Sequence, residues 1–204
     1  MAAMAGRRTT PAKRALDLIA ATLLALLLVT EGRPVFHVSE RMRAPDRPFR
    51  LWKQRTMTVT RADSGVPGGD KISRITPTGR LLRRTRLDEI PQLWNVLKGD
   101  MSFVGPRPPL RQYVERFPQV YAQALRSRPG ITGLPTLRYH RHEKTLLARC
   151  HSAVETDALY ARACVPRKAH LDLICQRHRT HCLDMVLMVE TLPNTDPSRF
   201  TRHK

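Results

Sequence analysis

The chain has 204 residues, enough for one domain with a core of its own. Lysine and arginine number 36 against 17 acidic residues, and the resulting formal net charge of +19 indicates polyanionic partners: nucleic acid, an anionic membrane surface or phosphorylated substrates. Aromatic residues make up only 5% of the chain and no zinc-finger or RNA-stacking pattern is present, so we expect no nucleic-acid partner.

The first element is an apolar run at residues 18–29, which follows four basic side chains. A helix over residues 15–29 would be about 22 Å long, shorter than the roughly 30 Å hydrocarbon core of a bilayer. It is consistent with a cleaved signal peptide, a buried core helix or a helix that enters one leaflet. The cleavage site is poor, and the basic flank favours contact with cytoplasmic headgroups. We therefore predict that residues 1–31 form a basic flank and a membrane-anchoring helix.

Short β-prone runs at residues 34–38 and 49–53 predict a β-hairpin, with a polar, proline-containing stretch at 43–48 between them. Residues 60–70 predict a loop, and a helix is expected to begin within 78–82. Residues 90–97 predict a short helix, with Pro91 in its first turn and Gly99 just after its end. The remaining expected elements are a helix at 110–126, whose aromatic row suits core packing, a tight loop at 129–133, and closing helices at 154–163 and 169–192.

These elements predict an α+β fold that is mainly helical, with an N-terminal membrane-inserted helix and a small β-hairpin. We expect the catalytic domain to comprise residues 32–192 and a C-terminal tail to comprise 193–204.

The stretch from Leu81 to Pro109 carries the densest chemistry in the chain. Asp88 and Glu89 are adjacent carboxylates that follow several arginines, Arg83 among them. On a helix they would point about 100° apart and border one pocket, with basic groups or Mg²⁺ balancing their charge. A carboxylate can also attack phosphorus and carry a covalent phosphoryl group. The alternative is that the pair only balances a helix dipole.

Further cations are candidates for phosphate binding. Arg107 lies in a Gly-Pro-Arg-Pro loop that fixes its backbone direction, which suits bidentate phosphate binding, although an ordinary surface arginine is the alternative. Lys53 and Arg55 end the expected hairpin, as phosphate contacts or as part of a solvated face. Residues 140–182 are rich in histidine and cysteine, but their spacing matches no closed zinc pattern. His140 and His142 remain as candidates for phosphate or nucleotide contacts, with solvated side chains as the alternative.

The chain resembles the bacterial sugar transferases, which are monotopic phosphoglycosyl transferases. The matching motifs are Lys13-Arg14-x-x-Asp17 and the segments 74–76, 79–83, 87–92, 95–102, 104–108 and 129–133. The block around Leu87-Asp-Glu-Ile-Pro-Gln92 is highly specific.

This resemblance implies transfer of a sugar phosphate from a nucleotide-diphosphate sugar, usually UDP-linked, to undecaprenyl phosphate, which initiates exopolysaccharide or other envelope-glycan synthesis. It implies that Asp88 is the nucleophile of a ping-pong mechanism and that Glu89 holds Mg²⁺ or assists proton transfer. Arg107 would hold a phosphate, and Asp157 would support the site. The implied location is the cytoplasmic face of the bacterial inner membrane, in contact with membrane lipid.

The apolar run ends at Val29, earlier than the family's usual anchor, and lacks its Ser-Pro break. This shortening motivates a second hypothesis, in which the chain is a catalytically impaired relative that acts as a membrane-bound interaction module.

Overall fold

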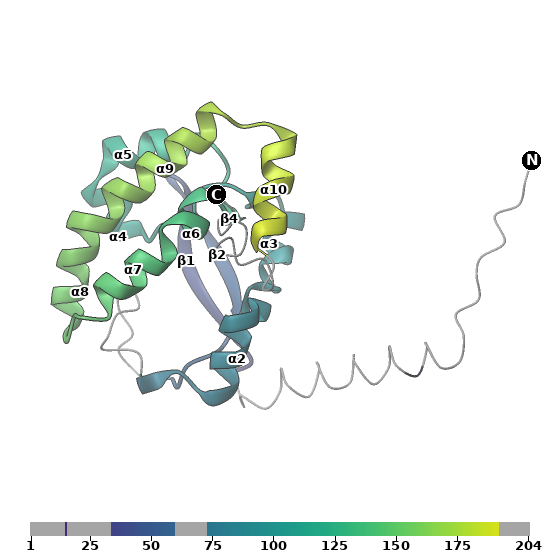
Figure 1. Ribbon diagram of the computed structural model, residues 1–204, viewed down its shortest axis with the longest axis vertical. Helices are drawn as coiled ribbons and strands as arrows, with labels where there is room; N and C mark the ends of the chain where they lie inside the picture. Colours follow the sequence, from purple (N-terminus) through teal and green to yellow (C-terminus); the bar gives the residue numbers. More distant parts are fainter. Residues whose placement is uncertain (1–14, 16–33, 60–72, 192–204) are drawn as a thin grey trace, which may run out of the picture.

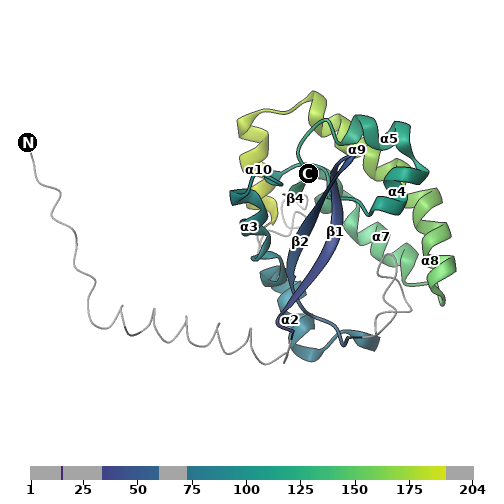
Figure 2. The ribbon, with the colours of Figure 1, turned by 180° about the vertical axis from the view of Figure 1, so that it is seen from behind.

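The computed structural model describes residue 15 and residues 34–59 and 73–191. In this part a long β-hairpin runs across the molecule from α2 towards α4 and α5, with helices on one side of it and the other side open in the view from behind (Figures 1 and 2). The elements in chain order are β1 (Phe36–Ala44), β2 (Arg47–Gln54), α2 (Pro77–Thr85), a 3-10 turn (Leu87–Glu89), α3 (Gln92–Leu97), β3 (Ser102–Val104), α4 (Arg111–Arg116), α5 (Pro118–Ala124), β4 (Gly130–Thr132), α6 (Leu134–Arg138), α7 (His140–Leu147), α8 (Ala153–Leu159), a π-helical turn (Tyr160–Cys164), α9 (Val165–Arg177) and α10 (His181–Thr191).

The predicted mixture of helices with a small β-hairpin is confirmed. No helix of the described residues is long and apolar enough to cross a bilayer. The predicted anchor at residues 15–29 lies outside those residues, except for Ala15, as do the predicted loop at 60–70 and the tail at 193–204.

The hairpin is longer than the sequence predicts. β1 and β2 pair antiparallel from Phe36 opposite Gln54 to Ala44 opposite Arg47, so most of the expected linker at 43–48 belongs to the strands. Met42 and Phe49 are buried near the turn, and this burial explains why pairing continues through a polar stretch.

Gly99 ends α3 as expected, with φ +77°, a conformation that glycine adopts without steric cost. The tight loop predicted at 129–133 is instead largely a strand, since β4 pairs in parallel with β3. A Cβ atom on Gly130 would lie 2.1 Å from the backbone nitrogen of Gly105, so only glycine permits this approach. Hydrogen bonds from Gly105 N to Thr132 O and from Gly130 N to Pro106 O, each 2.9 Å, then fix the loop that carries Arg107.

The long helices of the sequence prediction are divided. The helix expected at 110–126 breaks at Phe117, because Pro118 lacks an N–H and begins α5. The aromatic row of this segment, Tyr113, Phe117 and Tyr121, packs in the core as predicted. The helix expected at 169–192 is two helices, α9 and α10, and the first of them joins α8 through the π-helical turn. α6 and α7 occupy a segment for which we predicted no element.

Asp172 on α9 offers a test of this packing. It is 8% exposed, and burial raises its pKa from 3.8 to about 7, although Lys168 opposes the shift. The unfolded chain loses this proton first, so folding becomes less favourable as the pH rises from 3.8 to about 7, by up to roughly 4 kcal/mol. We expect Asp172→Asn to raise the free energy of unfolding at pH 8 and to change it little at pH 4. Urea unfolding at both pH values measures this, and an equal gain at both would contradict it.

Candidate active site

The backbone turns sharply just before the two adjacent carboxylates. Arg86 ends α2 in the left-handed region, with φ 58°, and the 3-10 turn that follows carries Asp88 and Glu89 inward. Both residues are only 8% exposed. Two adjacent buried carboxylates are costly unless cations compensate them, so their surroundings determine what each can do.

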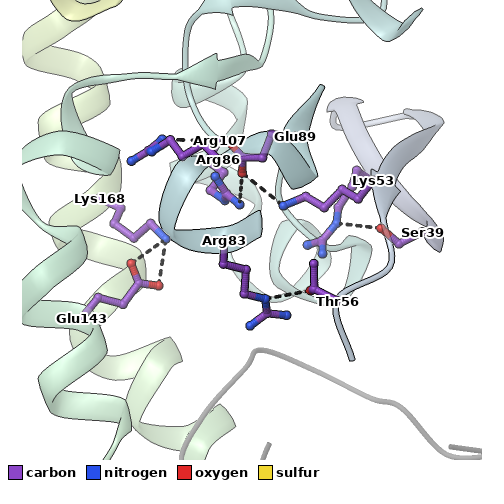
Figure 3. Close-up of polar contacts among 10 residues, drawn as sticks. Ser39, Lys53, Thr56, Arg83, Arg86, Glu89, Arg107, Glu143 and Lys168 are labelled. Carbon is purple, nitrogen blue, oxygen red and sulfur yellow. Dashed lines mark hydrogen bonds and ion pairs between the residues drawn. The ribbon is translucent and has the colours of Figure 1, made fainter. Parts of the chain in front are cut away.

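Glu89 is held by three cations. Its Oε1 accepts hydrogen bonds from Lys53 Nζ at 3.2 Å and from Arg107 Nη2 at 3.1 Å, and Arg86 Nη1 lies 3.9 Å from its Oε2 (Figure 3). Burial opposes ionisation of Glu89, but Arg107, Lys53 and Arg86 outweigh it and lower the pKa of Glu89 to about 2. Glu89 is therefore a fixed anion that joins the hairpin, the 3-10 turn and the loop after β3.

Asp88 differs from Glu89 in the direction of its pKa shift and in its contacts. Burial raises the pKa of its carboxyl, with Lys53, Arg83 and Arg107 opposing and Glu89 adding to the shift. Within the described residues no hydrogen bond or ion pair ties up the Asp88 carboxylate. It is thus a buried, poorly solvated carboxylate without a fixed partner, a state that favours reactivity over a structural role.

The two principal cations also influence each other. Burial lowers the pKa of Lys53, and so does the neighbouring charge of Arg107. Glu89 raises the pKa of Arg107, and the side chain of Arg107 remains 40% exposed. Arg107 therefore contacts Glu89 through Nη2, while part of its side chain remains exposed.

The remaining predicted residues are distributed unevenly. Arg83 is near Asp88 electrostatically, and its Nε donates to Thr56 Oγ1 at 2.8 Å. Burial lowers the pKa of His140, which interacts electrostatically with Arg107 and Arg86, so it borders the cluster. His142 instead packs against the ring of Tyr139.

Two predicted residues make their contacts away from the carboxylate pair. Arg55 Nε donates to the carbonyl of Pro34 at 2.7 Å. Asp157 accepts hydrogen bonds from Tyr113 Oη at 2.6 Å and Arg116 Nη1 at 3.0 Å, and these contacts join α8 to α4. The observed contacts of both residues are structural.

Sequence reasoning missed a second polar cluster next to Arg107. Lys168 Nζ on α9 donates to both carboxylate oxygens of Glu143 on α7, at 3.1 and 3.2 Å (Figure 3). It also donates to Tyr160 Oη at 3.2 Å. Glu143 and Tyr160 also interact electrostatically with Arg107. No local sequence signal joins α7 to α9 at these positions, and only the fold brings the residues together.

The donor set is compatible with magnesium. Glu89 Oε2 is a buried oxygen that no hydrogen-bond donor reaches within the described residues, and Asp88 offers a second hard oxygen ligand. No group of three or more metal-ligating side chains occurs in the described part of the chain. Mg²⁺ is usually bound by one or two carboxylates together with water and substrate phosphates, so these residues fit an ion shared with a substrate.

Sequence comparison identifies the family to which these residues belong. The family model described as bacterial sugar transferase matches residues 10–195. The chain belongs to the bacterial sugar transferase family. The match includes both carboxylates, the Arg107 loop and all the described helices.

Individual relatives are also similar over large parts of the chain. An uncharacterized sugar transferase of Bacillus subtilis is 42% identical over 59% of this chain and 65% of its own length. A UDP-glucose:undecaprenyl-phosphate glucose-1-phosphate transferase of Klebsiella pneumoniae is 36% identical over 74% of this chain and 36% of its own length. A putative undecaprenyl-phosphate N-acetylgalactosaminyl 1-phosphate transferase of Bacillus subtilis is 43% identical over 50% of this chain and 58% of its own. The chain thus spans between about a third and two thirds of the length of each of these relatives.

Proposed function

We propose that this chain is a phosphoglycosyl transferase that moves a sugar 1-phosphate from a nucleotide-diphosphate sugar, most simply a UDP-sugar, to undecaprenyl phosphate. The observation that carries the proposal is the contrast between two adjacent buried carboxylates. Glu89 is a fixed anion held by three cations, whereas Asp88 has a raised pKa and no hydrogen-bond or ion-pair partner in the described part of the chain. The activities for which the Klebsiella pneumoniae relative and the putative Bacillus subtilis transferase are named support the substrate classes.

In the proposed mechanism an Asp88 oxygen attacks the phosphorus that carries the sugar. The new aspartyl P–O bond forms as the bond to the bridging oxygen breaks, and the nucleoside monophosphate leaves. An oxygen of undecaprenyl phosphate then attacks the same phosphorus and releases Asp88. Arg107 and Lys53 stabilise the charge of the transferred phosphoryl group, because both point into the cluster beside Asp88.

Glu89 and Asp88 are the residues that would hold Mg²⁺, through their carboxylate oxygens. When bound, the ion would neutralise part of the charge of the donor's diphosphate. Lys53 and Arg107 position Glu89 for this role through Oε1, and no hydrogen-bond donor among the described residues reaches its buried Oε2.

The acceptor is a lipid, and the surface next to the carboxylate pair suits contact with a membrane. Ile90, Leu93, Trp94 and Leu97 follow Glu89 directly and are 42 to 80% exposed. Lys98 Nζ lies 5.9 Å from the ring centroid of Trp94, which places an amphipathic aromatic group beside a cation. Tryptophan and lysine are typical of the membrane interface, so this surface supports a location at the cytoplasmic face of the bacterial inner membrane.

A donor screen tests the proposal. Full-length protein in detergent with undecaprenyl phosphate and Mg²⁺ is expected to release UMP from at least one UDP-sugar, and release should require both the donor and the acceptor for multiple turnovers. Failure with every UDP-sugar would remove the activity and leave the alternative, a catalytically impaired relative that acts as a membrane-bound interaction module.

A further inference from the structure

Arg41 on β1 lies on the same face of the hairpin as Lys53. Lys53 is paired with His37 across the two strands, and alternate residues of a strand share a face, so His37, Ser39 and Arg41 lie on the Lys53 side. The only hydrogen bond that the Arg41 side chain forms within the described residues is a long one, from its Nε to Ser39 Oγ at 3.4 Å. A single hydroxyl does not compensate the charge of a guanidinium.

The charge of Arg41 is not matched by an acid. No carboxylate in the described ranges forms an ion pair with it. Burial lowers its pKa to about 10, the charge of Arg107 lowers it further in the same direction, and only the hydroxyls of Tyr160 and Tyr113 oppose these effects. Arg41 is therefore a partly buried cation at neutral pH, next to another cation. Such a charge is costly unless an anion binds.

The nearby carboxylates already have other partners. Glu89 accepts from Arg107 and Lys53, and Glu143 accepts two hydrogen bonds from Lys168. Asp88 interacts electrostatically with Lys53, Arg83 and Arg107, and Arg41 is not among the groups that shift its pKa. The positive charge of Arg41 is thus balanced by none of these three carboxylates.

Arg107 interacts with both Glu89 and Arg41. It donates a hydrogen bond to Glu89 Oε1 at 3.1 Å, and its charge lowers the pKa of Arg41. Two guanidinium groups in one cluster suit the two phosphates of a diphosphate, because each guanidinium can bind phosphate oxygens in a bidentate manner. Arg107, unlike Arg41, is among the groups that shift the pKa of Asp88, so Arg107 suits the phosphate next to Asp88.

We propose that Arg41 binds the nucleotide-side phosphate of a nucleoside diphosphate donor, while Arg107 binds the sugar-side phosphate next to Asp88. This assignment rests on the proposed function, because the transferase reaction defines the two phosphates. Arg41 then remains on the nucleoside monophosphate after the sugar phosphate has moved to Asp88.

Nucleotide binding separates the two roles. In full-length protein, Kd values for radiolabelled UMP and UDP are measured by equilibrium dialysis at one fixed Mg²⁺ concentration. Loss of a charge-assisted contact corresponds to a change in Kd of about 10- to 100-fold. We expect Arg41→Met to weaken both UMP and UDP by this factor. We expect Arg107→Met to weaken UDP by a similar factor and to leave UMP within about twofold.

Arg50→Met is the matched control, because Arg50 is an exposed arginine on the partner strand β2. It removes the same charge and should leave both Kd values within about twofold. Unchanged UMP affinity in Arg41→Met, or equal losses of UMP and UDP in Arg107→Met, would overturn the proposal. If Arg41→Met does not fold, Arg41→Lys keeps the charge but loses the planar fork, and it must still weaken UMP.

The binding pattern is independent of turnover. If no UDP-sugar supports UMP release while Arg41→Met still loses UMP, the proposed transferase activity fails and the phosphate assignment stands. If turnover is normal while Arg41→Met binds UMP as the unchanged protein does, the assignment fails and the activity stands.

Discussion

Asp88→Asn is expected to abolish sugar-phosphate transfer and the covalent phosphosugar protein together. The amide has no charge and cannot attack phosphorus, so the rate of transfer should fall on the order of 10⁴-fold or more. The measurement is incubation of donor labelled in its sugar without acceptor, followed by denaturation. The unchanged protein should retain about one label per chain and release an equal amount of UMP, and the Asp88→Asn variant should do neither.

Two variants separate this role from a general effect of charge. Asp100→Asn removes a carboxylate outside the cluster, whose partner is Arg43 at 3.9 Å, and should leave labelling intact. Glu89→Gln keeps the nucleophile but disturbs Lys53 and Arg107, so labelling should become slow while its final extent is preserved. Labelling of the Asp88→Asn protein at the normal rate would exclude Asp88 as the nucleophile.

The elements that were predicted well have strong local signals. Pro91 and Gly99 bound α3 because one lacks an N–H and the other adopts a positive φ, and both properties can be read from single residues. The hairpin was predicted from β-prone runs, and only its length was underestimated. The carboxylate pair and the Arg107 loop follow from adjacent residues, so their chemistry could be proposed from the sequence.

The features that the sequence did not predict depend on contacts between distant segments. β3 and β4 have three residues each, too few for a periodic pattern, and they become strands because Gly105 and Gly130 allow two backbones to meet. Arg41 lies in a strand with no motif around it, and its electrostatic interaction with Arg107 arises only in the folded chain. The opposite pKa shifts of Asp88 and Glu89 likewise depend on distant residues such as Lys53, which comes from β2.

Lys168→Met is expected to weaken donor binding although Lys168 does not contact either carboxylate of the pair. Lys168 neutralises Glu143, and their side chains are only 15% and 16% exposed. Without Lys168, Glu143 is an unpaired and poorly solvated anion whose charge already raises the pKa of Arg107. It should then compete with the donor's phosphate for that arginine, and we expect KM for the donor to rise about 10-fold or more with a smaller change in kcat.

The change in KM for the donor in a double variant distinguishes this competition from simple loss of packing. Glu143→Gln alone removes the competing charge and should leave KM for the donor within about twofold, and the double variant Lys168→Met/Glu143→Gln should restore KM towards the normal value. If Lys168 only stabilised the packing of α7 against α9, removal of its partner would not lower KM again. Steady-state kinetics of the three variants therefore decide whether Lys168 acts through Glu143 on the charge of Arg107, and a double variant as impaired as Lys168→Met would show that it does not.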